Sequence, residues 1–580
     1  MKIGSVEVLV DRDVVRCDGR ETELTPRSMD VLVYLAARAG RLVSANELLD
    51  ALWPRAYVGD NAVHKAINEI RRALGDNSRA PSYIRTVRGR GYTLIAPVQG
   101  VASPSPVVLP ASAVPNPSVA VLPFLNLGND PAQSFLCDGF AEDILNGLAR
   151  NPQLTVVART SSFSVAGSNV NAAAIGEALG AAYLVEGSVG RSRNRLRVSV
   201  RLIEAATGAT RWTQRYERQF SDVFAVQGEI TGEIQDALGV QLLGTSVSLK
   251  TASGGAYEAY LLGLHHASHT RWQQAQLAFE RAIALDPEFV DAFGALAALH
   301  GMASLHGLVP YRQERPVKLA YVERALALDA QHPGASAQRA LDQFLSARHF
   351  QAAIDALAET VARNPSNTDV LLLYGLALVG AGNVDLALRV FERQVLVDPL
   401  GTVGLVNYGR YLTFAGRDED AQATFERVER LGVQMALRFF EVALGRRDIE
   451  AMQTQLDRGA AAWGDLAPLH ALWCASVPYM RGAYAQARAI LQPVKAQLQR
   501  AHYIDSIIAR LEGEPALALE YYQQALDDIE PLAVIDVHGG AGLRRAFPDF
   551  YALPAYERMR ERLGLDPAAL ARLEFPALSF

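Results

Sequence analysis

Residues 60–74 read Asp60-Asn-Ala-Val-His-Lys-Ala-Ile-Asn-Glu-Ile-Arg-Arg-Ala-Leu74, and residues 83–92 read Tyr83-Ile-Arg-Thr-Val-Arg-Gly-Arg-Gly-Tyr92. The first stretch predicts an amphipathic helix with a cationic end, because its apolar residues recur at intervals of three and four. The second predicts two strands joined by a tight turn, because Gly89 and Gly91 tolerate backbone angles that other residues avoid. The chain therefore places a two-sided helix directly before a β-hairpin that carries arginines.

The predicted helix has an apolar side and a polar side, and Asp60 suits its N-cap. Residues at helical spacing are expected to face the core: Val63, Ala66, Ile67, Ile70 and Leu74. The remaining side chains are expected to point outward: Asn61, His64, Lys65, Asn68, Arg71 and Arg72. Arg88 and Arg90 flank Gly89 in the turn, where they have no core to serve.

These outward residues suit double-stranded DNA. Asn and Lys can hydrogen-bond to base edges, and Arg can bind phosphate or guanine. Residues 60–97 hold seven Lys and Arg against three Asp and Glu, although the whole chain has a net charge of −6. A solvated helix face is the alternative, but the arginine hairpin that follows favours a winged helix-turn-helix that binds DNA.

The residues before this helix complete a small α+β domain, residues 1–97. Short β-type runs and turn signals over residues 3–24 predict an antiparallel sheet. Thr25-Pro26 begins a helix that Gly40 closes, and Ser44 caps a second helix over residues 45–52.

The domain resembles the OmpR/PhoB-type winged-helix family, in the form found in ToxR/CadC-like regulators. The matching features are Leu24-Thr25-Pro26, Glu47-Leu48-Leu49, Trp53, Val63-x-x-x-Ile67-x-x-Ile70-Arg71-x-x-Leu74 and Val87-Arg-Gly-Arg-Gly-Tyr92. The resemblance implies that residues 60–74 are the recognition helix and residues 83–95 the wing. It also implies that the loop 53–60 contacts RNA polymerase or another protein, and that a homodimer binds paired sites. Many relatives carry a phospho-accepting receiver domain first. This chain begins at the winged helix, so aspartate phosphorylation is not expected to be its switch.

A proline-rich linker, residues 98–117, is expected to follow. Residues 97–117 contain six prolines, which prevent a helix and favour an extended tether. Regulators of the ToxR/CadC type place a transmembrane helix here, and this linker cannot form one. The chain has no apolar run of about 18 residues, no signal peptide and only three scattered cysteines. We therefore expect a cytoplasmic protein that does not contact a membrane.

Residues 118–245 predict a compact α/β domain. Expected strands are 118–124, 154–158, 183–189, 195–204 and 209–216, and expected helices are 134–149, 173–179 and 220–243. The segment resembles the TolB-like/FlgO-like domain in Val119-Ala-Val-Leu-Pro-Phe124, Phe140-Ala-Glu-Asp-Ile144 and Tyr183-Leu-Val-Glu-Gly-Ser188. That resemblance implies a binding or packing module and supplies no catalytic residues.

Residues 250–580 predict an all-α solenoid of tetratricopeptide type. Asn364-Pro365 and Asp398-Pro399 place two prolines 34 residues apart, the period of that repeat. We expect six to eight helical hairpins, with residues 301–316 as an insertion and a concave surface suited to a peptide or protein partner. The small residues, alanines, aromatics and terminal prolines of two units share one spacing: Gly375, Ala387, Phe391 and Pro399, and Gly263, Ala275, Phe279 and Pro287.

No constellation of residues predicts catalysis, a cofactor or a metal. His538-Gly-Gly-Ala-Gly542 is similar to an oxyanion-hole loop, but the chain lacks a GxSxG nucleophile, so a loop near the solenoid's end is expected. His265 and His269 are four residues apart, without a third ligand at recognisable spacing. We expect no enzyme.

Two hypotheses remain for this multidomain chain. The first is a sequence-specific transcription regulator whose middle domain and repeats receive a partner or ligand signal. The second is a tetratricopeptide interaction scaffold that uses its N-terminal module for docking. A steep salt dependence of binding to random duplex DNA would favour the first. The operator, the inducing signal and the direction of regulation do not follow from the sequence.

Overall fold

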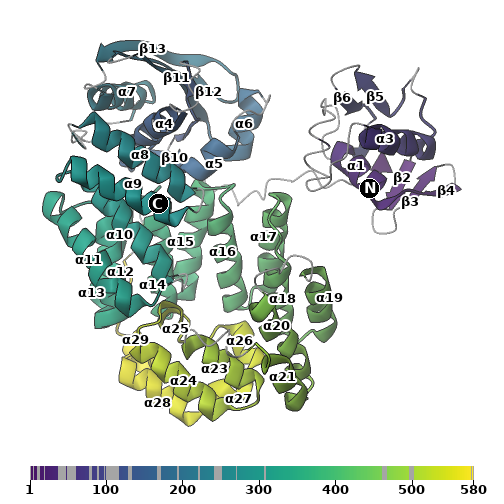
Figure 1. Cartoon of the computed structure of the whole chain (residues 1–580), viewed down its shortest axis with the longest axis vertical. Helices are drawn as coiled ribbons and strands as arrows, with labels where there is room; N and C mark the ends of the chain where they lie inside the picture. The colour runs from purple at the N-terminus through teal and green to yellow at the C-terminus, as the bar shows by residue number, and fades with distance from the viewer. Residues whose placement is uncertain are drawn as a thin grey trace. The chain divides into compact units, whose positions relative to one another are not determined.

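The structure is a computed structural model with two compact units, Met1–Val114 and Pro115–Phe580 (Figure 1). The described residues are 2–3, 6–9, 14–17, 20–36, 48, 61–77, 81–87, 91–96, 98–99, 117–127, 134–165, 171–192, 195–219, 223–240, 251, 253–268, 271–305, 309–459, 467–494, 502–576 and 578.

The first unit joins a small antiparallel sheet, two described helices and a β-hairpin. The sheet has the strand order β4-β3-β2-β1-β7. The expected sheet over residues 3–24 is confirmed, and β7 adds a strand just beyond residue 97, where Val98 pairs with Ile3. The elements are β1 (Lys2–Ile3), β2 (Val6–Leu9), β3 (Val14–Cys17), β4 (Arg20–Glu23), α1 (Pro26–Ala36), α3 (Asn61–Leu74), β5 (Ile84–Val87), β6 (Gly91–Leu94) and β7 (Val98–Gln99).

The core of this unit is built from the apolar sides of α1 and α3 and from the strands. All five residues predicted to form the apolar side of α3 are buried. Thr25 caps α1 as predicted, since its Oγ1 accepts a hydrogen bond from the Ser28 amide at 3.3 Å. Of the expected helix 45–52, the structure describes Leu48 alone, which is buried.

The second unit begins with a mixed sheet in the order β10-β8-β11-β12-β13, with β9 paired to β11. Strands β10, β8 and β11 are parallel, and β11, β12 and β13 are antiparallel. The five predicted strands and three predicted helices are confirmed, although α7 ends at Ala237, before the predicted end at residue 243, and α5 and β9 were not predicted. The elements are β8 (Ser118–Val121), β9 (Leu125–Asn126), α4 (Ser134–Ala149), β10 (Thr155–Val157), α5 (Arg159–Ser164), α6 (Ala172–Leu179), β11 (Tyr183–Ser192), β12 (Arg195–Glu204), β13 (Thr210–Gln219) and α7 (Val223–Ala237).

Helices pack on both faces of this sheet because successive strand residues point to opposite sides. Val119 and Val121 share one apolar cluster with α4 and α7. Ala120 and Leu122 share the opposite cluster with α6. This layering is the α/β architecture that the sequence predicts.

The rest of the chain is a series of helical hairpins, and the described residues contain eight of them (Figure 1). The hairpins are α8–α9 (Gly254–Ser268, Trp272–Leu285), α10–α11 (Val290–Leu305, Tyr311–Leu328), α12–α13 (Pro333–Asp342, Phe350–Arg363), α14–α15 (Thr368–Gly380, Val384–Val397), α16–α17 (Thr402–Ala415, Asp418–Arg430), α18–α19 (Ala436–Arg446, Ile449–Gly459), α20–α21 (Ala467–Met480, Tyr484–Leu491) and α23–α24 (His502–Leu511, Pro515–Asp527). A π-helix, η4 (Gln343–Ala347), continues α12.

The repeat spacing predicts the helix crossings correctly. A Cβ on Gly375 would lie 2.5 Å from the Phe391 ring, and one on Gly263 would lie 2.4 Å from the Phe279 ring. Only glycine allows the aromatic ring to approach the first helix so closely. The predicted insertion at residues 301–316 is wrong, because α10 continues to Leu305 and α11 begins at Tyr311.

The α/β domain and the hairpins form one unit. Their apolar residues share a cluster that runs from Val119 to Leu299. Buried Asp143 of α4 accepts hydrogen bonds from Gln227 of α7, at 3.0 Å, and from the Tyr257 hydroxyl of α8. Ser161 of α5 donates to Asp398, after α15, at 2.6 Å. The domain is thus fixed to the hairpins at two separate places.

Short helices complete the chain after α24: α25 (Pro531–Ile535), α26 (Ala541–Ala546), α27 (Pro548–Tyr551), α28 (Pro554–Leu563) and α29 (Pro567–Leu570). No helix among the described residues is both long enough and apolar enough to cross a membrane.

Candidate nucleic-acid interface

The polar side of α3 is open to solvent. His64, Lys65, Asn68 and Arg72 are exposed, whereas the residues between them are buried or half-buried. Their spacing of three and four residues places them on one side of the helix. Asn61 lies in the same helix, and its side chain is outside the described residues. The exposed set combines donors and acceptors for bases with two cations for phosphates.

His64 is held by the wing. Its Nδ1 lies 2.6 Å from the Tyr92 hydroxyl, and the two rings meet edge to face with centroids 5.9 Å apart. Tyr92 of β6 is buried. When the hydroxyl donates to Nδ1, the proton of the neutral imidazole sits on Nε2, which is then a hydrogen-bond donor.

Arg71 is buried, so the prediction that it points outward is wrong. Its Nη2 donates to the Ile84 carbonyl and to Thr86 Oγ1, both at 2.8 Å. Both acceptors belong to β5, and they bind one nitrogen of the guanidinium. Helical spacing alone places Arg71 at the edge of the polar side of α3. In this structure Arg71 therefore joins α3 to the wing.

Asp76 fixes the start of the wing, and the sequence reasoning missed it. Its carboxylate accepts hydrogen bonds from the amides of Ser82, Tyr83 and Ile84 at 2.7, 3.1 and 2.8 Å. It also lies 3.8 Å from Arg71 Nε. An aspartate after a helix-ending glycine and before a strand is a recognisable turn signal, so this role could have been inferred.

Glu69 joins α3 to the start of α1. Its carboxylate accepts the Thr25 amide at 2.7 Å, the Thr25 hydroxyl at 3.1 Å and the Ser28 hydroxyl at 2.8 Å. Burial raises the pKa of Glu69, but these hydrogen bonds and the charge of Lys65 outweigh it, so the pKa lies below its usual value. The polar side of α3 is thus oriented by contacts at both of its borders.

The wing consists of β5 and β6, whose pairing ends at Val87 and Gly91. Arg88 and Arg90 follow Val87 in the chain and lie outside the described residues. Gly91 has a φ of 136°, which favours glycine. Arg85 of β5 is exposed and is a further cation of the wing that the predicted set omitted.

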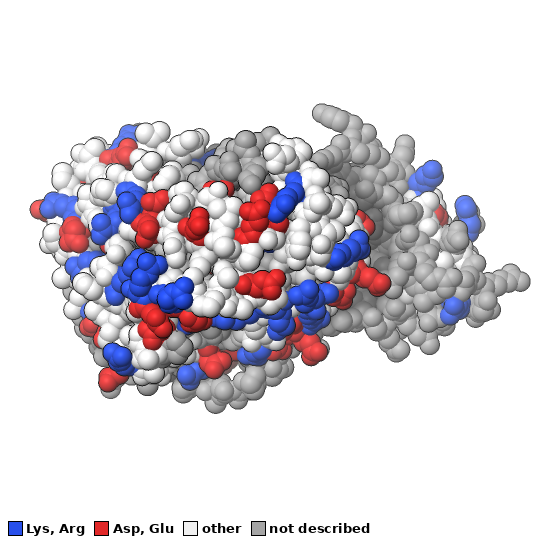
Figure 2. All heavy atoms as spheres, turned by 90° about the horizontal axis from the view of Figure 1, so that it is seen from below, with Lys and Arg blue, Asp and Glu red and all other residues white. Residues whose placement is uncertain are grey.

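The second unit offers a contrast in charge. Figure 2 shows basic and acidic side chains interspersed over the face in view, without a large area of one sign. Its exposed sheet arginines are also paired, as in Arg197–Glu217 at 2.9 Å and Arg201–Glu186 at 2.5 Å. Nucleic-acid binding proteins instead gather cations on one face.

The chain is similar in parts to known proteins. The family model "Transcriptional regulatory protein, C terminal" matches residues 19–94. The transcriptional activator CadC of Escherichia coli is 37% identical over 99 residues, which are 17% of this chain and 19% of CadC. A protein of Rhizobium meliloti named putative adenylate cyclase 3 is 33% identical over 184 residues, 30% of this chain and 31% of that protein. The chain thus spans less than a third of either relative. The solved structure of the type IV pilus biogenesis factor PilW is 16% identical and covers 37% of this chain and 95% of its own, with a TM-score of 0.30.

In this chain a winged-helix domain that matches a transcriptional regulatory family model precedes an α/β domain and a tetratricopeptide-type solenoid. The N-terminal domain belongs to the OmpR/PhoB-type winged helix-turn-helix family.

Proposed function

We propose that the chain is a sequence-specific transcription regulator whose helix α3 reads the major groove. The observation that carries this proposal is the exposure of His64, Lys65, Asn68 and Arg72 on one side of α3, opposite its buried apolar side. Lys65 and Asn68 contact base edges, with Asn61 and His64 beside them. Arg72, Arg88 and Arg90 bind phosphates.

Arg71 has a different role in this proposal. Its guanidinium is bound to β5 and is not available to a base. It acts as a positioning residue, because it sets the distance between α3 and the wing. Proteins that use two neighbouring grooves depend on that distance.

The second unit receives the signal in this proposal. The α/β domain is fixed to the hairpins at Asp143 and at Ser161, so a partner bound to either part acts on the whole unit. Residues 53–60 contact RNA polymerase or another protein, and the regulator binds paired DNA sites as a homodimer. We assign no catalytic step to any residue.

Genome-wide footprinting followed by gel-shift assays with the full chain tests the proposal. We expect a defined site whose preference over random duplex is lost in the double variant Lys65→Ala/Asn68→Ala. Arg88→Ala should instead weaken binding to all sequences alike, because phosphate contacts carry no sequence information. The absence of any preferred site, or a site unaffected by these substitutions, would contradict the proposal and favour a docking module.

A further inference from the structure

The inner surface of the solenoid is filled by the chain itself. Residues 531–546, which we name the hub segment, contain α25, α26 and the loop between them. Helix α25 packs against α10 and α14, and α26 packs against α16 and α18. Each of these four is the first helix of its hairpin, the helix that lines the inner face of such a solenoid. Figure 1 shows α25 and α26 beside these helices.

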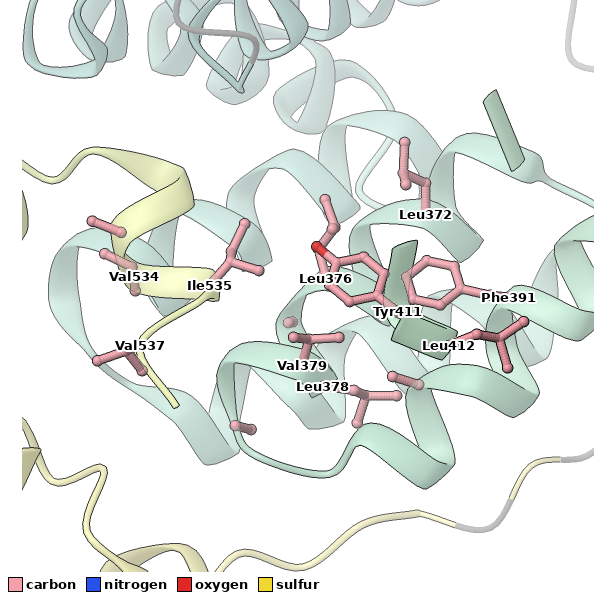
Figure 3. Packing of buried hydrophobic residues seen from close by; sticks show 14 of the residues in the cluster. Leu372, Leu376, Leu378, Val379, Phe391, Tyr411, Leu412, Val534, Ile535 and Val537 are labelled. Atoms are coloured by element: carbon pink, nitrogen blue, oxygen red, sulfur yellow. The ribbon is translucent and has the colours of Figure 1, made fainter. Parts of the chain in front are cut away.

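Aliphatic side chains anchor the start of the hub segment. Val534, Ile535 and Val537 are each at most 5% exposed. Figure 3 shows Ile535 directed toward Leu376 and Val379 of α14. Shape and apolar burial therefore hold this part of the segment in place.

Backbone contact continues along the segment. The His538 Nε2 donates to the Gly380 carbonyl at 2.8 Å, at the end of α14. A Cβ on Gly445 of α18 would lie 3.0 Å from the Gly542 Cα, and one on Gly540 would lie 2.4 Å from the Phe414 ring of α16. Small residues are thus required at these points for the segment to enter the groove.

One ion pair fixes the register. Arg410 of α16 donates to Asp536 Oδ2 at 2.5 Å, and Asp536 is 3% exposed. The other carboxylate oxygen, Oδ1, has no hydrogen-bond partner among the described residues, and the buried Tyr411 hydroxyl beside Arg410 has none either. One oxygen of the hub segment and one hydroxyl of α16 are thus buried without a hydrogen bond, which costs stability.

The hub segment is also weakly structured by itself. Helix α25 has five residues and α26 has six, and isolated helices of that length are unstable in water. Their order depends on contacts with the groove and with α24 and α28, from which the Tyr522 and Tyr556 hydroxyls donate to the Ala533 and Val537 carbonyls.

We propose that the inner face of α10, α14, α16 and α18 is a peptide-binding groove, and that the hub segment is its resident ligand. The partner is a peptide of the same chemistry: two aliphatic residues, an acidic residue for Arg410, a third aliphatic residue, a donor for the Gly380 carbonyl and then small residues. This inference rests on the proposed reception of a signal by the second unit and names the site. Partner binding displaces the hub segment from the groove.

A synthetic peptide of residues 531–546 tests this with the full chain. The unmodified chain should bind the labelled peptide weakly, because the tethered segment competes at an effective concentration on the order of millimolar. Gly540→Val should expel the tethered segment, since Gly540 has an ordinary φ of −58° and the three atoms nearest to an added Cβ all belong to Phe414. Peptide affinity should then rise at least about tenfold. Equal affinity for the two folded chains overturns the proposal.

Two matched controls identify the groove as the binding site. A peptide with Asp536→Ala should bind the Gly540→Val chain at least about tenfold more weakly, because it cannot pair with Arg410. Adding Gly445→Val to that chain narrows the groove itself and should abolish binding. Peptide binding that survives both changes overturns the proposal.

Hydrogen exchange on the unmodified chain keeps the test decisive if Gly540→Val does not fold. Amides of residues 535–545 should exchange at least about tenfold faster than those of α14 and α16, because the segment opens while the hairpins stay folded. If the amides of the hub segment exchange as slowly as those of α14 and α16, the segment is a permanent part of the core, and the proposal is overturned. None of these measurements uses DNA, so their failure leaves the DNA-binding proposal untouched.

Discussion

The polar side of α3 and the inner face of the hairpins differ in what covers them. On α3, Lys65, Asn68 and Arg72 are exposed, and no described element of the first unit covers them. On α14 and α16 the inward surface is covered by residues 531–546. A surface suited to a ligand can therefore be left open to solvent or be covered by another segment of the same chain. The contacts between elements in the folded structure show which of these two cases applies.

The largest expected effect concerns the filled surface. Arg410→Ala leaves Asp536 buried without its cation, so the free energy of unfolding of the second unit should fall by about 3 kcal/mol. The control is Arg488→Ala, whose partner Glu514 lies at 2.7 Å in a half-exposed pair, and it should cost less than about 1 kcal/mol. Urea unfolding followed by circular dichroism measures both. Equal losses would mean that the Arg410 pair does not hold the segment.

Adjacent arginines on α3 sharpen the contrast within the first unit. Arg71→Ala should lower its free energy of unfolding by about 2 kcal/mol, because the Asp76 carboxylate loses its nearby cation and the Ile84 carbonyl loses a donor. Arg72→Ala, on the exposed side, should leave stability unchanged and weaken DNA binding. Unfolding and gel-shift measurements on the two variants should therefore give opposite patterns. If the Arg71→Ala chain were as stable as the unmodified chain and bound DNA more weakly, Arg71 would be a residue that contacts DNA directly.

Low pH should reduce the free energy of unfolding of the second unit, because His538 of the hub segment is buried. The pKa of His538 is lowered to about 4, because burial and the charges of Arg560 and Arg544 together outweigh the hydrogen bond to Gly380, which raises it. The unfolded chain therefore binds a proton at pH values between about 6.5 and 4 at which the folded chain does not. Stability from this site is complete above pH 6.5 and falls with decreasing pH, by about 2 kcal/mol at pH 5.

His538→Gln is the control for this titration, because its amide can still donate to the Gly380 carbonyl and does not ionise. Unfolding of the second unit measured at pH 7.5 and 5 should show a smaller acid loss in this variant. An unchanged loss would assign the acid sensitivity to other groups.

The smallest expected effect is on sequence preference. Lys65→Ala/Asn68→Ala should reduce discrimination between specific and random duplex by about 1–2 kcal/mol, roughly tenfold, with unfolding unchanged. Competition gel shifts measure the ratio directly. Equal weakening on both duplexes would make these residues phosphate contacts.

Periodicity predicted most of the fold because it reports which side of an element is buried. Val63, Ile67 and Ile70 were placed in the core from spacing alone, and the Gly375–Phe391 crossing followed from the repeat period. Arg71 was misplaced because its acceptors, the Ile84 carbonyl and Thr86, come from another element, and spacing within one helix cannot show them.

Residues 538–542 of the hub segment were predicted as a loop near the end of the solenoid, and the location of the segment in the groove was missed. Pro531 and the glycines between His538 and Leu543 interrupt the repeat pattern, which signals a departure from hairpins. The sequence does not show where such a segment docks, because the contacts with Gly380 and Gly445 lie about 100 residues or more away in the chain.

We propose above all that α3 and the wing form an open cationic surface for duplex DNA. The salt dependence of DNA binding by the full chain is the sharpest test of this surface. We expect the affinity for random duplex DNA to fall steeply between about 50 and 200 mM salt. The logarithm of the affinity should fall with the logarithm of the salt concentration with a slope of about −0.9 per phosphate contact. Arg72→Ala should make that slope shallower by about one. A flat salt dependence, or no binding at any salt concentration, would contradict the claim.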